Sequence, residues 1–132
     1  MTMAESRMVI SAGQCGYDNS RLRSLIRSIN PDLFFHATDS AAETERLFEE
    51  NPGSIALVLV NRVFDANGQS GLELIQTLTG KQAESSPHVM LVSNYEDAQA
   101  MAIAHGALPG FGKSALGDSR TADRIKSALE IN

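Results

Sequence analysis

The sequence predicts an α/β fold in which strands and helices alternate along a single domain. The chain has 132 residues, which is the usual length of one domain. Short apolar runs alternate with stretches in which apolar residues recur every three or four positions. One apolar run, residues 55–60, is unbroken and rich in β-branched residues, which is typical of a strand covered on both faces of a parallel sheet.

The first strand and helix are separated by a glycine-rich loop. Residues 8–11 predict the strand and residues 12–19 the loop. Leu22 and Ile26 then lie on the apolar side of an amphipathic helix, with arginines between them. The candidates for the N-cap of this helix are Asp18, Asn19 and Ser20.

The remaining elements continue the alternation. Strands are predicted over residues 33–37, 55–60, 88–92 and 108–112. Helices are predicted over residues 40–50, from a cap at Ser70 through Leu78, over 96–105 and over 118–131. In the fourth helix, Ala98, Met101 and Ala102 are expected to face inward.

Five strand–helix pairs in this order predict a parallel sheet between two layers of helices. Right-handed crossovers leave few topologies, and we expect the flavodoxin-like (βα)5 sandwich with strand order 2-1-3-4-5. Residues 7–131 form the domain in this interpretation, and residues 1–6 are an N-terminal tail. Ligands of such sheets bind at the carboxyl ends of the strands, so the residues that follow each strand are the candidate site.

Composition excludes several classes of function. The net charge of −5 and the absence of a run of basic residues argue against binding to nucleic acid or to an anionic membrane. The longest apolar run is far shorter than the roughly 20 residues of a membrane helix, and the N-terminus has no signal-peptide pattern. With a single cysteine, Cys15, the chain cannot form an internal disulfide. We therefore expect a cytoplasmic protein.

The residues at the strand ends carry a resemblance to a known family. Four apolar residues lead to Asn61, another apolar run leads to Ser93, and a glycine-broken segment carries Lys113. The stretch Ala-His-Gly-Ala at 104–107 precedes that last segment, and Gly71 opens the third helix. In order and spacing, these features resemble the receiver domain of bacterial response regulators over nearly the whole chain.

The resemblance implies a phosphorylation site that this chain has altered. Receivers accept a phosphoryl group on an aspartate with the help of Mg²⁺, and Asn61 stands where that aspartate is expected. Their acidic pair after the first strand is replaced here by Ser-Ala-Gly-Gln, which includes Ala12 and Gly13. Two losses in one site remove both the acceptor and the carboxylates that a hard cation prefers. We expect no catalytic residue, no cofactor and weak or absent Mg²⁺ binding.

The sequence thus predicts a degenerate acceptor pocket. Its members are Asn61, Ser93, Lys113, Ala12 and Gly13. Lys113 is expected either to hydrogen-bond Asn61 or to neutralise the pocket. The aromatic switch position of receivers falls on Gly110, with Phe111 next to it, which puts the usual coupling to the output face in doubt.

Other residues near the pocket leave alternatives open. Asp18 and Asp65 are acids that could replace the missing ligands, although capping and turn formation also explain them. The loop from Gly13 to Asp18 could hold an anion at a helix N-terminus, but a plain surface loop also explains its glycines. Cys15 is expected to be unreactive, and the spacing of the three histidines predicts no metal site.

The leading hypothesis is a pseudo-receiver: a non-enzymatic signalling module that acts by protein–protein interaction. The resemblance implies a histidine kinase, an output protein or a second copy of the chain as partner. A homodimer would use the face between Asp97 and Lys126. The alternatives are a small-molecule or nucleotide-binding domain on the same fold, and an atypical receiver phosphorylated on another acid.

Overall fold

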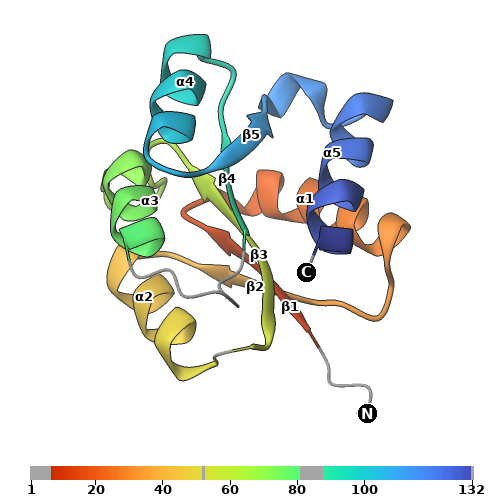
Figure 1. Ribbon diagram of the computed structural model, residues 1–132, viewed down its shortest axis with the longest axis horizontal. Coiled ribbons are helices and arrows are strands. Elements are labelled where there is room, and N and C mark those ends of the chain that lie inside the picture. The colour runs from red at the N-terminus through yellow and green to blue at the C-terminus, as the bar shows by residue number, and fades with distance from the viewer. Residues whose placement is uncertain (1–6, 52, 81–87, 132) are drawn as a thin grey trace.

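The computed structural model describes residues 7–51, 53–80 and 88–131. Five parallel strands form one sheet in the order β2-β1-β3-β4-β5, with helices on both of its faces (Figure 1). This arrangement confirms the predicted flavodoxin-like fold and strand order. The predicted tail, residues 1–6, lies outside the described residues.

The elements alternate from the first strand to the last helix. In chain order they are β1 (Met8–Ala12), α1 (Gly16–Ile29), β2 (Phe34–Thr38), α2 (Ala41–Glu50), β3 (Ile55–Asn61), α3 (Gly71–Gly80), β4 (His88–Val92), α4 (Glu96–Ala104), β5 (Leu108–Phe111) and α5 (Ser119–Ile131). A short 3₁₀ turn, Lys113–Ala115, joins β5 to α5. Most predicted bounds agree with these to within one or two residues.

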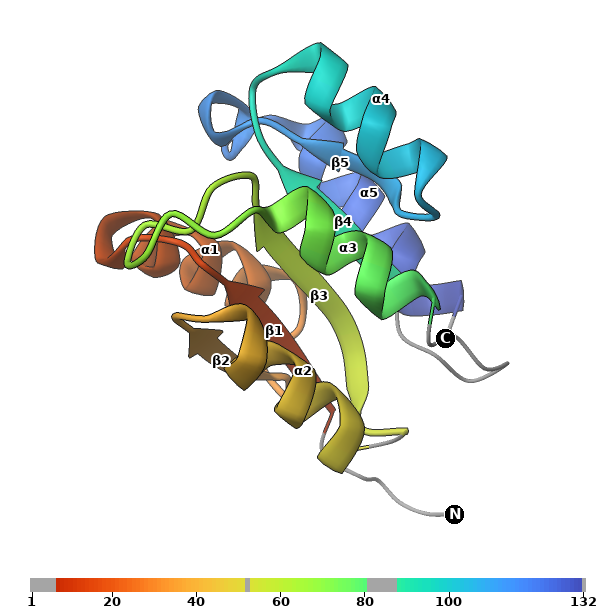
Figure 2. The ribbon, with the colours of Figure 1, turned by 90° about the vertical axis from the view of Figure 1, so that its left-hand side faces the viewer.

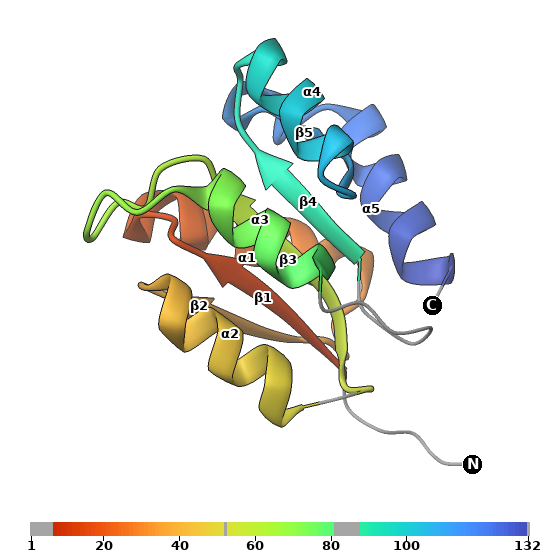
Figure 3. The same cartoon turned by 60° about the vertical axis from the view of Figure 1, so that its left-hand side comes forward.

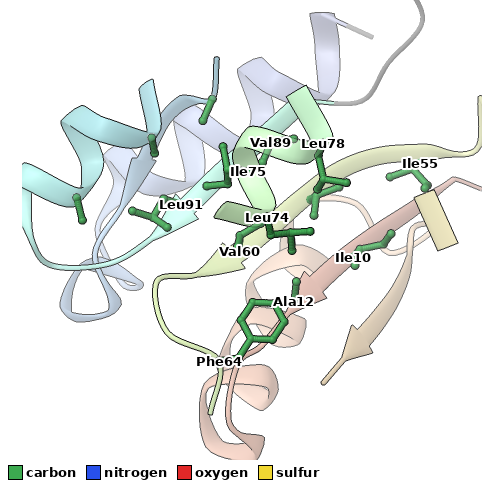
Figure 4. Close-up of a cluster of buried hydrophobic side chains, with 14 residues drawn as sticks. Ile10, Ala12, Ile55, Val60, Phe64, Leu74, Ile75, Leu78, Val89 and Leu91 are labelled. Carbon is green, nitrogen blue, oxygen red and sulfur yellow. The ribbon is translucent and has the colours of Figure 1, made fainter. Parts of the chain in front are cut away.

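The sheet separates two apolar clusters. Ile10 and Val60 point toward α2, α3 and α4, whereas Val9 and Leu59 point toward α1 and α5. Figure 2 shows the two layers of helices, and Figure 4 shows the first cluster. Every residue of β3 is buried, as the unbroken apolar run predicts. Burial on both faces therefore fixes β3 at the centre of the fold.

Strand register brings the carboxyl ends of the central strands together. Ala12 pairs with Val60, so Gly13 lies level with Asn61 in the sheet. Asn61 pairs in turn with Val92, the residue before Ser93. The candidate positions after β1, β3 and β4 thus meet at one edge.

The start of α1 corrects the first prediction. The helix begins at Gly16, inside the predicted loop, so only residues 13–15 connect it to β1. None of the predicted N-caps occupies that position. Cys15 is the N-cap, and its Sγ accepts a hydrogen bond from the backbone N–H of Asp18 at 3.4 Å. The prediction was wrong because the preferred capping residues were available three positions later, within what is now the first turn.

Helix α4 corrects the second prediction. Ala98 and Ala102 are buried as expected, but Met101 is 52% exposed. Ile103 is exposed as well, at 46%. Two alanine side chains therefore provide the buried side of α4, and larger apolar residues face outward. None of the described helices is both long and apolar enough to cross a membrane.

Gly71 is fixed by its close approach to β3. A Cβ atom at this position would lie 1.9 Å from the carbonyl oxygen of Asn61. We predict that Gly71→Ala lowers the free energy of unfolding by about 1–3 kcal/mol, because helix and strand must separate to admit the methyl group. Urea denaturation measures the change.

Gly16→Ala is the matched control, since Gly16 begins α1 and a Cβ there has no neighbour within 4 Å. It should leave stability unchanged or raise it slightly. Equal effects of the two substitutions would contradict the steric argument.

Candidate functional site

Three of the predicted residues line one pocket at the carboxyl edge of the sheet. Asn61 ends β3, Ser93 follows β4, and Lys113 begins the turn after β5. Arg62, Asp65 and Tyr95 line the same pocket. The sequence-based grouping of Asn61, Ser93 and Lys113 therefore agrees with the geometry, although the role of each residue stays a prediction.

The side-chain amide of Asn61 is a hydrogen-bond donor to the backbone. Its Nδ2 donates to the carbonyl oxygen of Gly13 at 3.0 Å and to that of Val63 at 2.7 Å. Both amide protons are thus engaged, and the residue is only 7% exposed. An ionised aspartate has no proton to donate and could make neither bond.

Gly13 is covered by an aromatic ring. Its φ is +82°, a value that side-chain-bearing residues rarely adopt. A Cβ atom here would lie 2.3 Å from Cδ1 of Phe64, whose side chain is almost completely buried. In Figure 4 the Phe64 ring lies beside Ala12 at the end of β1. The segment that would carry the acidic pair of a receiver is packed under this ring.

Lys113 pairs with an acid that comes from α1. Its Nζ lies 3.0 Å from Oδ2 of Asp18, and the two side chains are 35% and 12% exposed. Asp18 occupies the first turn of α1, where the helix dipole favours a negative charge. The sequence predicts a bond to Asn61 or neutralisation of the pocket, whereas in the structure Lys113 forms an ion pair with Asp18. Helix α1 thus supplies a carboxylate beside the site, although not as the N-cap.

Asp65 differs from Asp18 because it is exposed and lines the pocket. Its backbone N–H donates to the carbonyl oxygen of Gly13 at 2.9 Å. Within the described residues, no three or more His, Cys, Asp or Glu side chains are grouped to hold a metal. Asp18 is already neutralised by Lys113, and Gly13 already accepts two hydrogen bonds. Asp65 is thus the single acid that lines the pocket among the described residues, whereas Mg²⁺ in proteins is usually held by one or two carboxylates together with several waters.

The loop between β1 and α1 is held by Asn19. The hydroxyl of Ser11 donates to Asn19 Oδ1 at 2.7 Å, and Asn19 Nδ2 donates to the carbonyl oxygen of Gln14 at 3.3 Å. The Gln14 amide is buried, and neither of its polar atoms has a hydrogen-bond partner in the described part of the chain. An anion bound at this helix N-terminus would lie close to the Asp18 carboxylate, which disfavours the anion-binding alternative.

The β4–α4 loop is tied down by two short polar side chains. Ser93 Oγ accepts a hydrogen bond from the backbone N–H of Tyr95 at 3.1 Å. Asn94 Oδ1 accepts from both the backbone N–H and the hydroxyl of Ser114, at 3.1 and 3.0 Å. Tyr95 is exposed, and the Arg62 guanidinium stacks on its ring at 4.6 Å from the centroid. The segments that follow β3 and β4 thus meet at the rim of the pocket.

Gln99 of α4 is a residue that the sequence analysis missed. Its Nε2 lies within hydrogen-bonding distance of the carbonyl oxygens of Leu91, Ser93 and Phe111, at 2.9, 3.1 and 3.3 Å. Its Oε1 accepts from the backbone N–H of Gly110 at 3.2 Å. Gly110 is the one feature of the sequence that relates to these bonds. The structure explains this glycine, because a side chain there would collide with Leu91 and Gln99.

The predicted switch position therefore holds no aromatic ring. Gly110 has no side chain to move, and the amide of Gln99 fills the adjacent space between β4 and β5. Phe111 is buried in the cluster beneath α1 and α5. Coupling through a rotating aromatic side chain at position 110 is therefore impossible in this chain.

Comparisons with known proteins support the fold assignment. Neither a protein-family model nor a curated protein sequence matches the chain. Among solved structures, the signal receiver domain of a DNA-binding response regulator (MerR) from Colwellia psychrerythraea 34H is similar with a TM-score of 0.76. It is 16% identical, and the alignment covers 95% of this chain and 99% of that one.

Two further structures show the same similarity. The receiver domain of an HD domain-containing protein from Pseudomonas fluorescens Pf-5 has a TM-score of 0.75 and 18% identity, over 99% of this chain and 92% of that one. The beryllofluoride-activated NtrC4 receiver domain dimer has a TM-score of 0.73 and 16% identity, over 94% and 97%. The chain therefore has the receiver fold of two-component response regulators.

The pair formed by Lys113 and Asp18 should contribute to stability because its carboxylate is buried. We predict a coupling free energy of about 1 kcal/mol from a double-mutant cycle of Lys113→Met and Asp18→Asn. Urea denaturation of the four proteins gives the value.

The pair formed by Arg120 and Asp118 is the control, since it has the same N–O separation of 3.0 Å but lies on the surface. Hydrogen bonds from Arg120 lower the pKa of Asp118, so the pair is formed at neutral pH. Its coupling free energy should be smaller because solvent screens it. A larger coupling at the surface pair would contradict the burial argument.

Proposed function

We propose that this chain is a receiver-fold signalling module that acts by protein–protein interaction and is not phosphorylated at position 61. One observation carries the proposal: the side-chain amide of Asn61 donates hydrogen bonds to two backbone carbonyls. The position of the phosphate acceptor in receivers therefore has a structural role in this chain. The amide is also a poor nucleophile, and no carboxylate replaces it within β3.

The charges around the pocket support the same conclusion. Phosphoryl transfer depends on positioning and on neutralising the charge of the transferred group. Lys113, the cation that would contact a phosphoryl group, is held by Asp18. Among the described residues, Asp65 is the single acid that lines the pocket, which supports weak Mg²⁺ binding. We therefore propose that Mg²⁺ binds weakly or not at all and that the chain is not an enzyme.

The proposed contact surface lies on α4, β5 and α5, between Asp97 and Lys126. Met101 and Ile103 are large apolar side chains that α4 exposes to solvent. A groove beside Ile103 is also lined by Phe111 and Arg124, whereas Met101 lines a separate groove with Tyr95. Apolar residues with a charged rim are typical of protein interfaces. We propose a second copy of the chain, a histidine kinase or an output protein as the partner of this surface.

An atypical receiver is the second candidate, and one observation favours it. Asp65 exposes its carboxylate in the pocket that also contains Lys113 and Ser93. An acceptor at this position would face the same cation and hydroxyl as the usual aspartate. No group of three or more His, Cys, Asp or Glu side chains is found among the described residues, which weighs against efficient transfer.

Phosphorylation distinguishes the two candidates. Incubation with acetyl phosphate and Mg²⁺ should give no phosphoadduct in the intact-mass spectrum, because no acceptor carboxylate stands beside a bound metal. Beryllium fluoride with Mg²⁺ should likewise leave the NMR signals of Asn61 and Ser93 unshifted.

A phosphoadduct that disappears in Asp65→Asn would overturn the proposal in favour of the atypical receiver. Asp39→Asn is the control, because Asp39 is exposed and lies outside the pocket. An adduct lost equally in both variants would indicate chemistry unrelated to the pocket.

Dimerisation tests the proposed surface with a second copy of the chain as the partner. If a second copy binds this face, Ile103→Arg should lower the dimer fraction in sedimentation velocity at least tenfold, because a charge would enter an apolar contact. Phe34→Arg is the matched control, since Phe34 is 61% exposed on β2, at the opposite edge of the sheet.

Equal loss of dimer in both variants would contradict the placement of the interface. A wild-type protein that stays monomeric at high concentration would exclude the second copy as partner.

A further inference from the structure

The segment between β3 and α3 is an ordered hairpin. Val63 pairs with Ser70 in an antiparallel bridge. The backbone N–H of Phe64 donates to the carbonyl of Gln69 at 2.9 Å, and that of Gly68 donates back to Phe64 at 2.8 Å. Gly68 has a φ of +73°, a backbone conformation that glycine adopts readily in turns. We call residues 62–70 the β3–α3 hairpin.

The hairpin is docked on the ends of two other strands. The backbone N–H of Asp65 donates to Gly13, next to β1. Beyond β2, Asn67 Nδ2 donates to the carbonyl of Asp39 at 3.2 Å, and Gln69 Oε1 accepts from the N–H of Ala41 at 2.8 Å. Figures 2 and 3 show the hairpin extending past the end of β1, beside the start of α1. The β3–α3 hairpin thus covers one side of the degenerate pocket, and these hydrogen bonds hold it in place.

Asn61 joins the two sides of this contact. Its Nδ2 bonds the carbonyl of Val63 at the base of the hairpin and the carbonyl of Gly13 on the β1 side. Gly13 also accepts the hydrogen bond from Asp65, so one carbonyl anchors both the amide and the hairpin. The buried ring of Phe64 fills the remaining space over Gly13.

We propose that Asn61 is a latch that holds the β3–α3 hairpin closed over the end of β1, and that position 61 therefore requires a hydrogen-bond donor. An ionised aspartate would place its oxygens against two carbonyl oxygens, which repel it. The two cations that line the pocket already have other partners: Lys113 pairs with Asp18, and Arg62 stacks on Tyr95. Neither is therefore placed to neutralise an aspartate at position 61. The amide at 61 is thus required by the hairpin, and restoring the aspartate alone loosens the hairpin without rebuilding a receiver site.

Amide hydrogen exchange measures the latch directly. The amides of Phe64, Asp65 and Gly68 report on the hairpin because each donates a backbone hydrogen bond there. In Asn61→Asp and in Asn61→Ala, their exchange should accelerate on the order of tenfold or more, since two hydrogen bonds to the backbone are lost. Amides of β3 and β4 should keep their protection, which shows that the sheet remains folded.

Asn51→Asp is the matched control. Its Nδ2 also donates to a backbone carbonyl, that of Leu47 at 2.9 Å, and the substitution introduces the same charge at the far end of α2. This variant should leave the exchange of the hairpin amides unchanged. Acceleration in Asn51→Asp equal to that in Asn61→Asp would assign the effect to charge and overturn the latch.

Two other outcomes would also overturn the inference. One is unchanged hairpin exchange in Asn61→Ala, the variant that removes the donor without adding charge. The other is tight Mg²⁺ binding by Asn61→Asp with the hairpin still protected. The latch rests on the proposed function only in its role within a signalling module that is not phosphorylated at position 61. The hydrogen-exchange result does not depend on that function. Phosphorylation of the wild type on Asp65 would defeat the proposed function yet leave the exchange result intact.

Discussion

Burial of β3 on both faces is the constraint on which the rest of the structure depends. Its seven residues are all buried, between β1 and β4 in the sheet and between two layers of helices. A strand in this position fixes the direction and register of its neighbours. It also fixes where its last side chain, Asn61, emerges. The pocket lies at that edge because parallel strands bring all their carboxyl ends to one side.

Asparagine and aspartate at position 61 differ in one side-chain atom, a nitrogen in place of an oxygen, and this atom decides the chemistry of the position. A carboxylate at 61 would accept hydrogen bonds and attract cations, whereas the amide donates to two carbonyls. The surroundings agree with the amide: Gly13 offers a carbonyl in place of an acid, and Phe64 covers it with an apolar ring. Asp18, the buried acid beside the site, comes from α1 and neutralises Lys113. The hydrogen bonds and the ion pair around position 61 thus agree with an amide there.

Sequence reasoning predicted the fold and the grouping of Asn61, Ser93 and Lys113 because both follow from local patterns. Apolar periodicity identifies strands and helices, and strand ends then meet by topology. The start of α1, the exposure of Met101 and the partner of Lys113 depend on tertiary contacts, which periodicity does not contain. The bonds of Gln99 are of the same kind, since a polar residue on a helix usually faces solvent.

Two amide side chains join elements that lie far apart in the sequence. Asn61 joins the β3–α3 hairpin to the end of β1, and Gln99 joins α4 to β4 and β5. The buried side of α4 consists of Ala98 and Ala102, so the bonds of Gln99 position a helix that apolar packing holds only weakly. That helix presents Met101 and Ile103 to solvent. Under the proposed function, this surface is therefore formed before any partner arrives, and binding depends on the partner's chemistry and concentration instead of on a phosphorylation event.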